Sequence, residues 1–307
     1  MAGKKFNPDN DIPDLSGKVI FITGGTAGLG KESIQALAAH NPSHIYFTGR
    51  STSRATALID SLRTQHPTAP ITFLNCDLSS LSSVVETAKA FLAQSQRLDV
   101  LICNAGIWAL TPGLTTDGYE IQFGTNHVAH ALLIKLLLPT LLRTAEEPNS
   151  DVRIVSLTSA AFAAHPVGGI RFHDIKTPQD KGFFGMWTRY GQSKLANLLY
   201  AAELARRYPS ITTLAIHPGV VKTDMVNSLG YLDKILLHFA QLGRPVSPEE
   251  GAWNQLWAAT GAREEMRSGV YYVPVGAKGM LVRNGGDEKL AGELWEWTEE
   301  ELKGYEA

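Results

Sequence analysis

Tyr190 and Lys194 stand four residues apart in the stretch TRYGQSKLAN. Leu195 and Leu198 continue at helical spacing, so the two polar side chains share one face of a helix beside its apolar stripe. A free tyrosine has a pKa of about 10 and is a poor base at neutral pH, but a neighbouring ammonium stabilises the phenolate and lowers that pKa. The pair is therefore a candidate proton donor and acceptor, although such a pair by itself is usually an ordinary solvated helix face.

A second group of residues has the sequence pattern of a phosphate-binding site. The stretch VIFITGGTAGLGKESIQALA, residues 19–38, runs from a strand pattern through a glycine-rich turn into a helix pattern. Gly24, Gly28 and Gly30 permit a tight turn and a close approach of the backbone to a pyrophosphate at the helix N-terminus. This context predicts a dinucleotide site, and the alternative is a glycine turn without a ligand.

The residues after the second strand pattern bear on which nicotinamide dinucleotide binds. In NAD binders an acidic residue there accepts hydrogen bonds from the ribose hydroxyls. This chain has Gly49 followed by Arg50, with Arg54 a turn later. A guanidinium suits a 2′-phosphate, which favours NADP(H) over NAD(H). The alternative is that Arg50 stacks on adenine or faces water.

The elements that must position these residues are short apolar runs alternating with helical patterns. Most runs are continuous, which is typical of parallel strands buried on both faces. We therefore predict one α/β domain, a Rossmann-like doubly wound parallel sheet of about seven strands, over residues 17–307. Residues 1–16 are expected to be an N-terminal extension. The strands are expected within residues 18–25, 44–49, 71–77, 98–106, 151–159, 212–219 and 269–276.

Composition narrows the class of protein further. The chain has 307 residues, a net charge of −2 and 44% hydrophobic residues, and no Lys/Arg-rich block that would suit nucleic acid. Cys76 and Cys103 lie in strand patterns and are expected to be buried thiols. His127 and His130 have no third ligand near them in sequence, so no metal site is expected.

The ends and the apolar runs of the chain bear on its location. The N-terminus is polar, without the apolar stretch of a signal peptide. The run 130–142 is too short to span a bilayer and is interpreted as a buried helix, so no transmembrane segment is expected. These features predict a cytoplasmic protein.

Further short motifs follow in order, and the set resembles the short-chain dehydrogenase/reductase family. The likeness is strongest to its single-domain retinol-dehydrogenase and WW-domain-oxidoreductase branch, and it covers roughly residues 17–276. The motifs are the glycine turn, Asp77-Leu78, Asn104-Ala105-Gly106, Asn126, Ser159, the Tyr190/Lys194 pair and Pro218-Gly219 with Thr223.

The resemblance implies hydride transfer between NADP(H) and a carbonyl or alcohol. Tyr190 would exchange a proton with the substrate oxygen, and Ser159 would position that oxygen. Lys194 would tune Tyr190 and hold the ribose, and Asn126 would complete a proton relay. Expected cofactor contacts are Gly24, Thr26, Ala27, Gly28, Leu29, Gly30, Arg50, Asp77, Leu78, Asn104, Ala105, Gly106, Asn126, Tyr190, Lys194, Pro218, Gly219, Val221 and Thr223.

Two segments should build the substrate pocket: the insert between Ser159 and Tyr190, and a lid at about residues 222–245. Their apolar content favours a hydrophobic substrate, either a retinoid or lipid-like alcohol or a natural-product ketone. A catalytically silent NADP(H)-binding sensor or partner-binding module is the alternative, and both a monomer and a homodimer suit the long insert. The apolar residues are Phe183, Phe184, Met186, Trp187, Met225, Leu229, Leu236 and Phe239.

Overall fold

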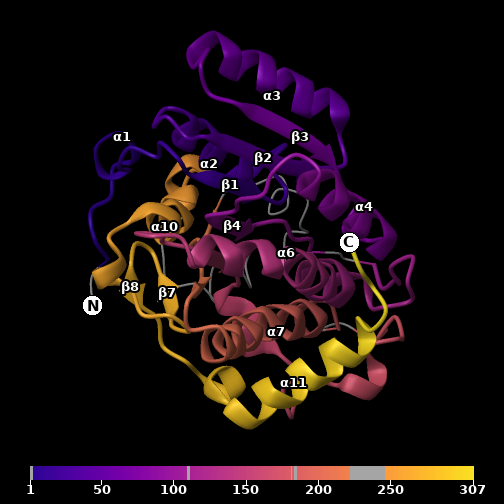
Figure 1. The fold of residues 1–307 in the computed structure, drawn as a ribbon. Coiled ribbons are helices and arrows are strands. Elements are labelled where there is room, and N and C mark those ends of the chain that lie inside the picture. The colour runs from indigo at the N-terminus through magenta and orange to yellow at the C-terminus, as the bar shows by residue number, and fades with distance from the viewer. Residues whose placement is uncertain (1–2, 109–110, 181, 183–184, 222–245) are drawn as a thin grey trace.

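The computed structural model describes residues 3–108, 111–180, 182, 185–221 and 246–307. Within these ranges one sheet has the strand order β3-β2-β1-β4-β5-β6-β7-β8 (Figure 1). Strands β1 to β7 pair in parallel and β8 pairs antiparallel with β7. The strands are β1 (Val19–Ile22), β2 (His44–Gly49), β3 (Ile71–Asn75), β4 (Val100–Cys103), β5 (Arg153–Leu157), β6 (Thr212–Ile216), β7 (Tyr271–Val273) and β8 (Ala277–Lys278).

The predicted doubly wound parallel sheet is confirmed. Each of the first seven strands lies inside a predicted apolar run, whereas β8 has only two residues and is too short to produce such a run. Along β1, Ile20 and Ile22 belong to one core cluster and Phe21 to the other. Because successive side chains point to opposite faces of the sheet, a strand covered on both faces has a continuous apolar sequence.

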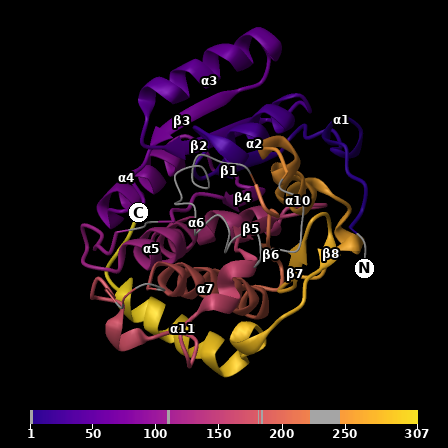
Figure 2. The same ribbon diagram turned by 180° about the vertical axis from the view of Figure 1, so that it is seen from behind.

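Helices cover both faces of the sheet (Figures 1 and 2). One face carries α2 (Gly28–Ala38), α3 (Thr52–Gln65) and α10 (Pro248–Thr260). The other carries α4 (Leu81–Leu92), α6 (Ala129–Ala145) and α7 (Gly185–Arg207), with α11 (Glu288–Glu301) packed against α7. The shorter helices are α1 (Pro8–Asp11) and α5 (Ile121–Phe123), with a π-helical turn over Gly124–Val128.

Residues 3–16, expected to be an extension, lie against the domain. Phe6, Ile12 and Leu15 are buried in the core cluster that contains α2 and α10. The backbone N–H of Lys4 donates to the carbonyl of Val275 at 2.9 Å. This segment therefore contributes apolar burial to the fold and does not project from it.

The most apolar helical stretch runs from Ile121 to Ala145. It is long and apolar enough to cross a bilayer, but 67% of its most apolar window is buried inside the protein, as in a core helix. This agrees with the buried helix predicted for residues 130–142. Both cysteines, Cys76 and Cys103, are free and buried, as expected.

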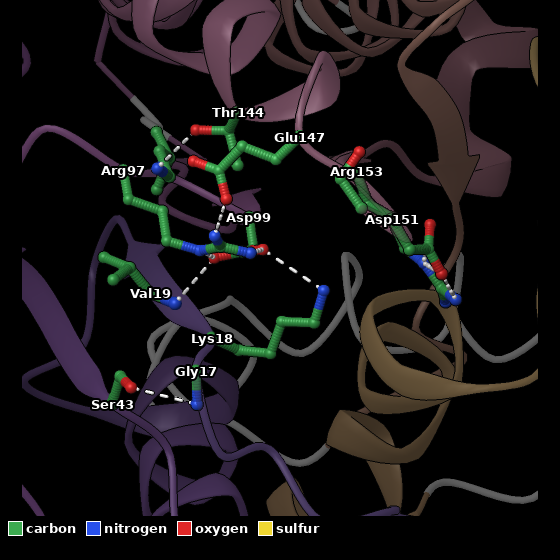
Figure 3. A network of polar contacts seen from close by, with 12 residues as sticks. Gly17, Lys18, Val19, Ser43, Arg97, Asp99, Thr144, Glu147, Asp151 and Arg153 are labelled. Atoms are coloured by element: carbon green, nitrogen blue, oxygen red, sulfur yellow. Dashed lines mark hydrogen bonds and ion pairs between the residues drawn. The ribbon is translucent and has the colours of Figure 1, made fainter.

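A buried carboxylate, that of Asp99, joins residues at the amino-terminal ends of neighbouring strands (Figure 3). Asp99 is 0% exposed and accepts hydrogen bonds from the backbone N–H of Val19 at 2.9 Å and from Arg97 at 2.7 Å. Lys18 Nζ also lies 3.2 Å from Asp99 Oδ1, and Arg97 pairs in addition with Glu147. The network joins the starts of β1 and β4 to the end of α6.

Replacing Asp99 with alanine should lower the free energy of unfolding by about 3 kcal/mol, because it leaves a buried N–H and the Lys18 ammonium without this acceptor and removes one of the two carboxylates that pair with Arg97. Urea denaturation measures this. Asp60→Ala is the matched control, since its ion pair with Arg63 is exposed on α3, and it should cost less than about 1 kcal/mol. Equal losses in the two variants would contradict the structural role of the network.

Candidate active site

A cavity of about 140 Å³ lies beyond the carboxyl ends of β1, β4, β5 and β6. The strand order reverses between β1 and β4, which is where open α/β sheets bind ligands. The cavity brings together nine of the predicted site residues. They are Leu29, Asn104, Gly106, Ser159, Tyr190, Lys194, Pro218, Gly219 and Val221.

The glycine turn has the geometry of a phosphate cradle. Gly24 and Gly28 adopt φ values of +70° and +53°, a region that favours glycine. A Cβ on Gly30 would lie 2.4 Å from the carbonyl oxygen of Gly24, so this close approach also requires glycine. Ala27 precedes α2 without a side-chain cap, which leaves the first N–H groups of the helix available to an anion. These residues fit a dinucleotide pyrophosphate.

Two residues after β4 hold that turn in place. Asn104 Nδ2 donates to the carbonyl of Thr23 at 2.8 Å, and the N–H of Ala105 donates to Thr23 Oγ1 at 2.9 Å. His130 extends this series of hydrogen bonds. Its Nε2 lies 2.9 Å from Thr23 Oγ1, and its Nδ1 lies 2.9 Å from the carbonyl oxygen of Asn126. Because that carbonyl only accepts, Nδ1 carries the proton and Nε2 accepts from the Thr23 hydroxyl. His130 is thus a structural link here.

The expected adenosine end lies beside the same turn. A Cβ on Gly49 would come within 2.6 Å of Thr26 Cγ2, so the end of β2 packs closely against the turn. Arg50 follows directly and is exposed. Asp77 Oδ1 accepts from both the N–H and the hydroxyl of Ser79, which shows that this carboxylate shapes its own loop. Its neighbour Leu78 is buried.

The three residues expected to carry the chemistry meet on one wall of the cavity. Ser159, which follows β5, hydrogen-bonds through its side chain to Tyr190. On α7, Lys194 Nζ lies 5.7 Å from the centre of the Tyr190 ring and donates to the carbonyl of Leu157 at 3.1 Å. The nearby Thr158 hydroxyl instead donates to the backbone carbonyl of Lys194 at 2.6 Å. Ser159 is therefore the hydroxyl paired with the phenol.

The pKa values of this pair reflect burial. Burial raises the pKa of Tyr190 to about 12, although the hydrogen bond from Ser159 acts to lower it. Burial also lowers the pKa of Lys194 to about 8. The sequence leads us to expect a lowered pKa for Tyr190. In the protein without bound cofactor, desolvation outweighs that effect and the pKa is raised. A phenolate at neutral pH therefore requires further positive charge, such as that of an oxidised nicotinamide.

Asn126 is fully buried in the π-helical turn, and its side chain holds a loop. Its Oδ1 accepts from the N–H of Ile107 at 2.7 Å, and its Nδ2 donates to the Ile107 carbonyl and to Ser193 Oγ, both at 3.0 Å. A Cβ on Gly106 would lie 3.3 Å from both Asn126 Oδ1 and Lys194 Nζ. Asn126 Oδ1 and Lys194 Nζ therefore both lie close to Gly106. The Asn126 amide also positions the segment that follows β4.

Trp108, which no sequence motif marks, also lines the cavity. Its ring is stacked on Tyr190 with centroids 5.4 Å apart and an angle of 18° between the planes. Trp187, expected in the pocket, meets Trp108 at 4.5 Å and 72°. An isolated tryptophan in a loop has no periodic signal, so sequence patterns could not place it. His217, which directly precedes Pro218, also lines the cavity, and burial lowers its pKa to about 4.

Several expected residues lie outside the described ranges. They are Thr223, Phe183, Phe184 and the whole lid segment 222–245 with its apolar side chains.

Comparison with known proteins identifies relatives along the whole chain. The protein-family model described as "short chain dehydrogenase" matches residues 18–169 of this chain. The short-chain dehydrogenase/reductase drtF of Aspergillus calidoustus is 36% identical, with 95% of this chain and 96% of that protein covered. Mouse retinol dehydrogenase 12 is 34% identical, with 92% and 85% covered.

Solved structures show the same architecture. An uncharacterized protein from Mycobacterium paratuberculosis superposes with a TM-score of 0.72 at 28% identity, and 97% of each chain is covered. A blue fluorescent protein from a metagenomic library, solved in complex with NADPH, superposes with a TM-score of 0.65 at 26% identity, covering 86% of this chain and 98% of that one.

Proposed function

Because this chain belongs to the short-chain dehydrogenase/reductase family of oxidoreductases, we propose that it interconverts a carbonyl and an alcohol on a hydrophobic small molecule with NADP(H). The observation that carries the proposal is the meeting of Ser159, Tyr190 and Lys194 at one cavity beyond the glycine turn. A silent binding module would have no need of this complete set.

The side chains divide the chemistry between them. When bound, the nicotinamide supplies the hydride that the carbonyl carbon accepts. The Tyr190 hydroxyl donates its proton to the carbonyl oxygen, which becomes the alcohol oxygen, and Ser159 holds that oxygen by a hydrogen bond. Lys194, with its ammonium beside the ring, stabilises the phenolate that remains. In the oxidative direction the same groups act in reverse, and Tyr190 accepts the proton.

The fit of the chain to a dinucleotide supports the cofactor part of the proposal. The pyrophosphate would rest on the N-terminus of α2 and the glycine turn, and Lys194 would hold the nicotinamide ribose. The exposed Arg50 would pair with a 2′-phosphate, which is the reason for preferring NADP(H). The NADPH-bound relative described above supports this choice at the level of the family.

Turnover with a panel of hydrophobic ketones, aldehydes and alcohols tests the reaction. The absorbance of NADPH should fall with a ketone and NADPH should form from NADP⁺ with an alcohol. A Tyr190→Phe sample gives the blank. If no member of the panel changes the NADPH absorbance above that blank, the proposed function is wrong.

Cofactor preference provides a separate prediction. Arg50→Ala should weaken NADPH binding about tenfold or more, because it removes a charge-assisted contact of roughly 1.5–3 kcal/mol. NADH lacks the 2′-phosphate, so its Kd should stay unchanged in a fluorescence titration. Arg63→Ala, in the last turn of α3 and likewise exposed, is the matched control for loss of a positive charge. Equal weakening of both cofactors by Arg50→Ala would contradict the assignment of Arg50.

A further inference from the structure

Three aromatic rings that pack against one another line the cavity. This aromatic wall consists of Trp108, Trp187 and Tyr190, and each of the three lines the cavity. Trp187 and Tyr190 come from α7, whereas Trp108 comes from the segment after β4. Two parts of the chain that are distant in sequence therefore supply one surface.

Two rings of the aromatic wall, Trp108 and Trp187, meet at a steep angle and form a corner. Trp108 is nearly parallel to Tyr190, at 18°, and Trp187 stands at 72° to Trp108. A flat ring that enters this corner lies parallel to one indole and meets the other edge to face. Both are preferred arrangements of aromatic pairs, and each stabilises a complex beyond the area buried, by up to about tenfold in an equilibrium constant.

The indoles have no polar role in the described part of the chain. The Nε1 atoms of Trp108 and Trp187 are both buried without a hydrogen-bond partner. Buried indole N–H groups usually find a partner, so these two rings are not held in place by polar contacts. Their large flat surfaces at the cavity therefore need another explanation, and contact with a ligand is one that accounts for both.

The position of the reacting oxygen connects this wall to the substrate. Ser159 and Tyr190 would hold the carbonyl oxygen between them, so a group attached to the carbonyl carbon extends along the wall that includes Tyr190. We propose that the substrate is a planar conjugated carbonyl compound, an aryl ketone or aldehyde, or the corresponding benzylic alcohol, whose ring stacks on the aromatic wall. This inference rests on the proposed function.

A flexible aliphatic chain is the competing occupant. Leucine or valine would pack such a chain equally well, and Leu157, Ala161 and Val221 already supply aliphatic surface around the cavity. An aliphatic substrate gains nothing from parallel or perpendicular ring planes. The presence of two indoles in these defined orientations favours the aryl compound.

A matched pair of ketones tests the inference. Acetophenone and cyclohexyl methyl ketone have the same connectivity and differ in whether the ring is flat. Because their intrinsic reactivities differ, the informative quantity is the change in their kcat/KM ratio on mutation. Trp108→Leu and Trp187→Leu should each shift that ratio threefold to tenfold against acetophenone. Trp108→Phe, which keeps a stacking ring and removes no hydrogen bond, should shift it less than Trp108→Leu.

Trp253 provides the control, since its Nε1 is likewise buried without a partner but it lies on α10 and does not line the cavity. Trp253→Phe should leave both rates unchanged. Inhibition of the wild-type enzyme by 1-phenylethanol and 1-cyclohexylethanol repeats the test without any variant, and the phenyl compound should bind more tightly. Unchanged ratios in both leucine variants, or equal inhibition, would overturn the inference while leaving the proposed function intact. Absence of NADPH-dependent turnover of every carbonyl compound would overturn the proposed function itself.

Discussion

Tyr190→Phe should reduce turnover by about 10²–10⁴-fold, because the variant keeps the ring and loses only the proton that the substrate oxygen exchanges. The stacking of Trp108 and the placement of Lys194 over the ring depend on the ring and not on the hydroxyl. Cofactor affinity should therefore remain nearly unchanged. Stopped-flow turnover and fluorescence titration with NADPH separate the two quantities.

Tyr208→Phe is the matched control for this variant. Tyr208 follows the end of α7, packs against Trp295 and does not line the cavity. Removal of its hydroxyl should leave turnover near the wild-type value. Near-normal turnover of Tyr190→Phe would show that another group moves the proton, and the mechanism proposed for this site would then be wrong.

Lys194→Met should also reduce turnover, by about 10²-fold or more, and at the same time make the cofactor-free protein more stable. Burial lowers the pKa of Lys194 from 10.5 to about 8, which means that folding at pH 7 has to accommodate a buried charge. Each factor of ten in proton affinity is about 1.4 kcal/mol, so the cost is on the order of 3 kcal/mol. The Leu157 carbonyl keeps a donor in Asn197, so methionine forfeits only about 1 kcal/mol of hydrogen bonding. A net gain on the order of 2 kcal/mol remains.

The sign of the pH dependence distinguishes this explanation from simple repacking. Between about pH 8 and 10.5 the unfolded chain holds the Lys194 proton and the folded chain does not, so wild-type stability should rise with pH across this window. The advantage of Lys194→Met should be fully present below pH 8 and should vanish as the pH approaches 10.5. Urea denaturation at a series of pH values measures both curves. A stability advantage that is independent of pH would contradict the buried-charge explanation.

The two active-site variants should also act as one unit. If Lys194 works by tuning Tyr190, the double variant should be no slower than the slower of the two single variants. Multiplicative losses would show that Lys194 acts mainly elsewhere, for example on the ribose of the cofactor.

Features that depend on neighbouring residues were predictable from the sequence. The backbone of Gly24 and Gly28 has positive φ because a tight strand-to-helix turn requires it, and glycine tolerates that conformation. Tyr190 and Lys194 share a helix face because their spacing places them there. The continuous apolar runs of β1 and its neighbours indicate strands with both faces covered, and the parallel sheet follows from their alternation with helices.

Features that depend on contacts between distant segments were decided by the tertiary structure alone. Trp108 reaches Tyr190 only because β4 ends and α7 begins at the same edge of the sheet, and no local pattern encodes that approach. The Asn126 amide faces Ile107 because the loop after β4 returns past the π-helical turn. The pKa values of Tyr190 and Lys194 follow from how much water the whole fold removes, so burial by distant residues reverses the direction expected for Tyr190 from its neighbour in sequence.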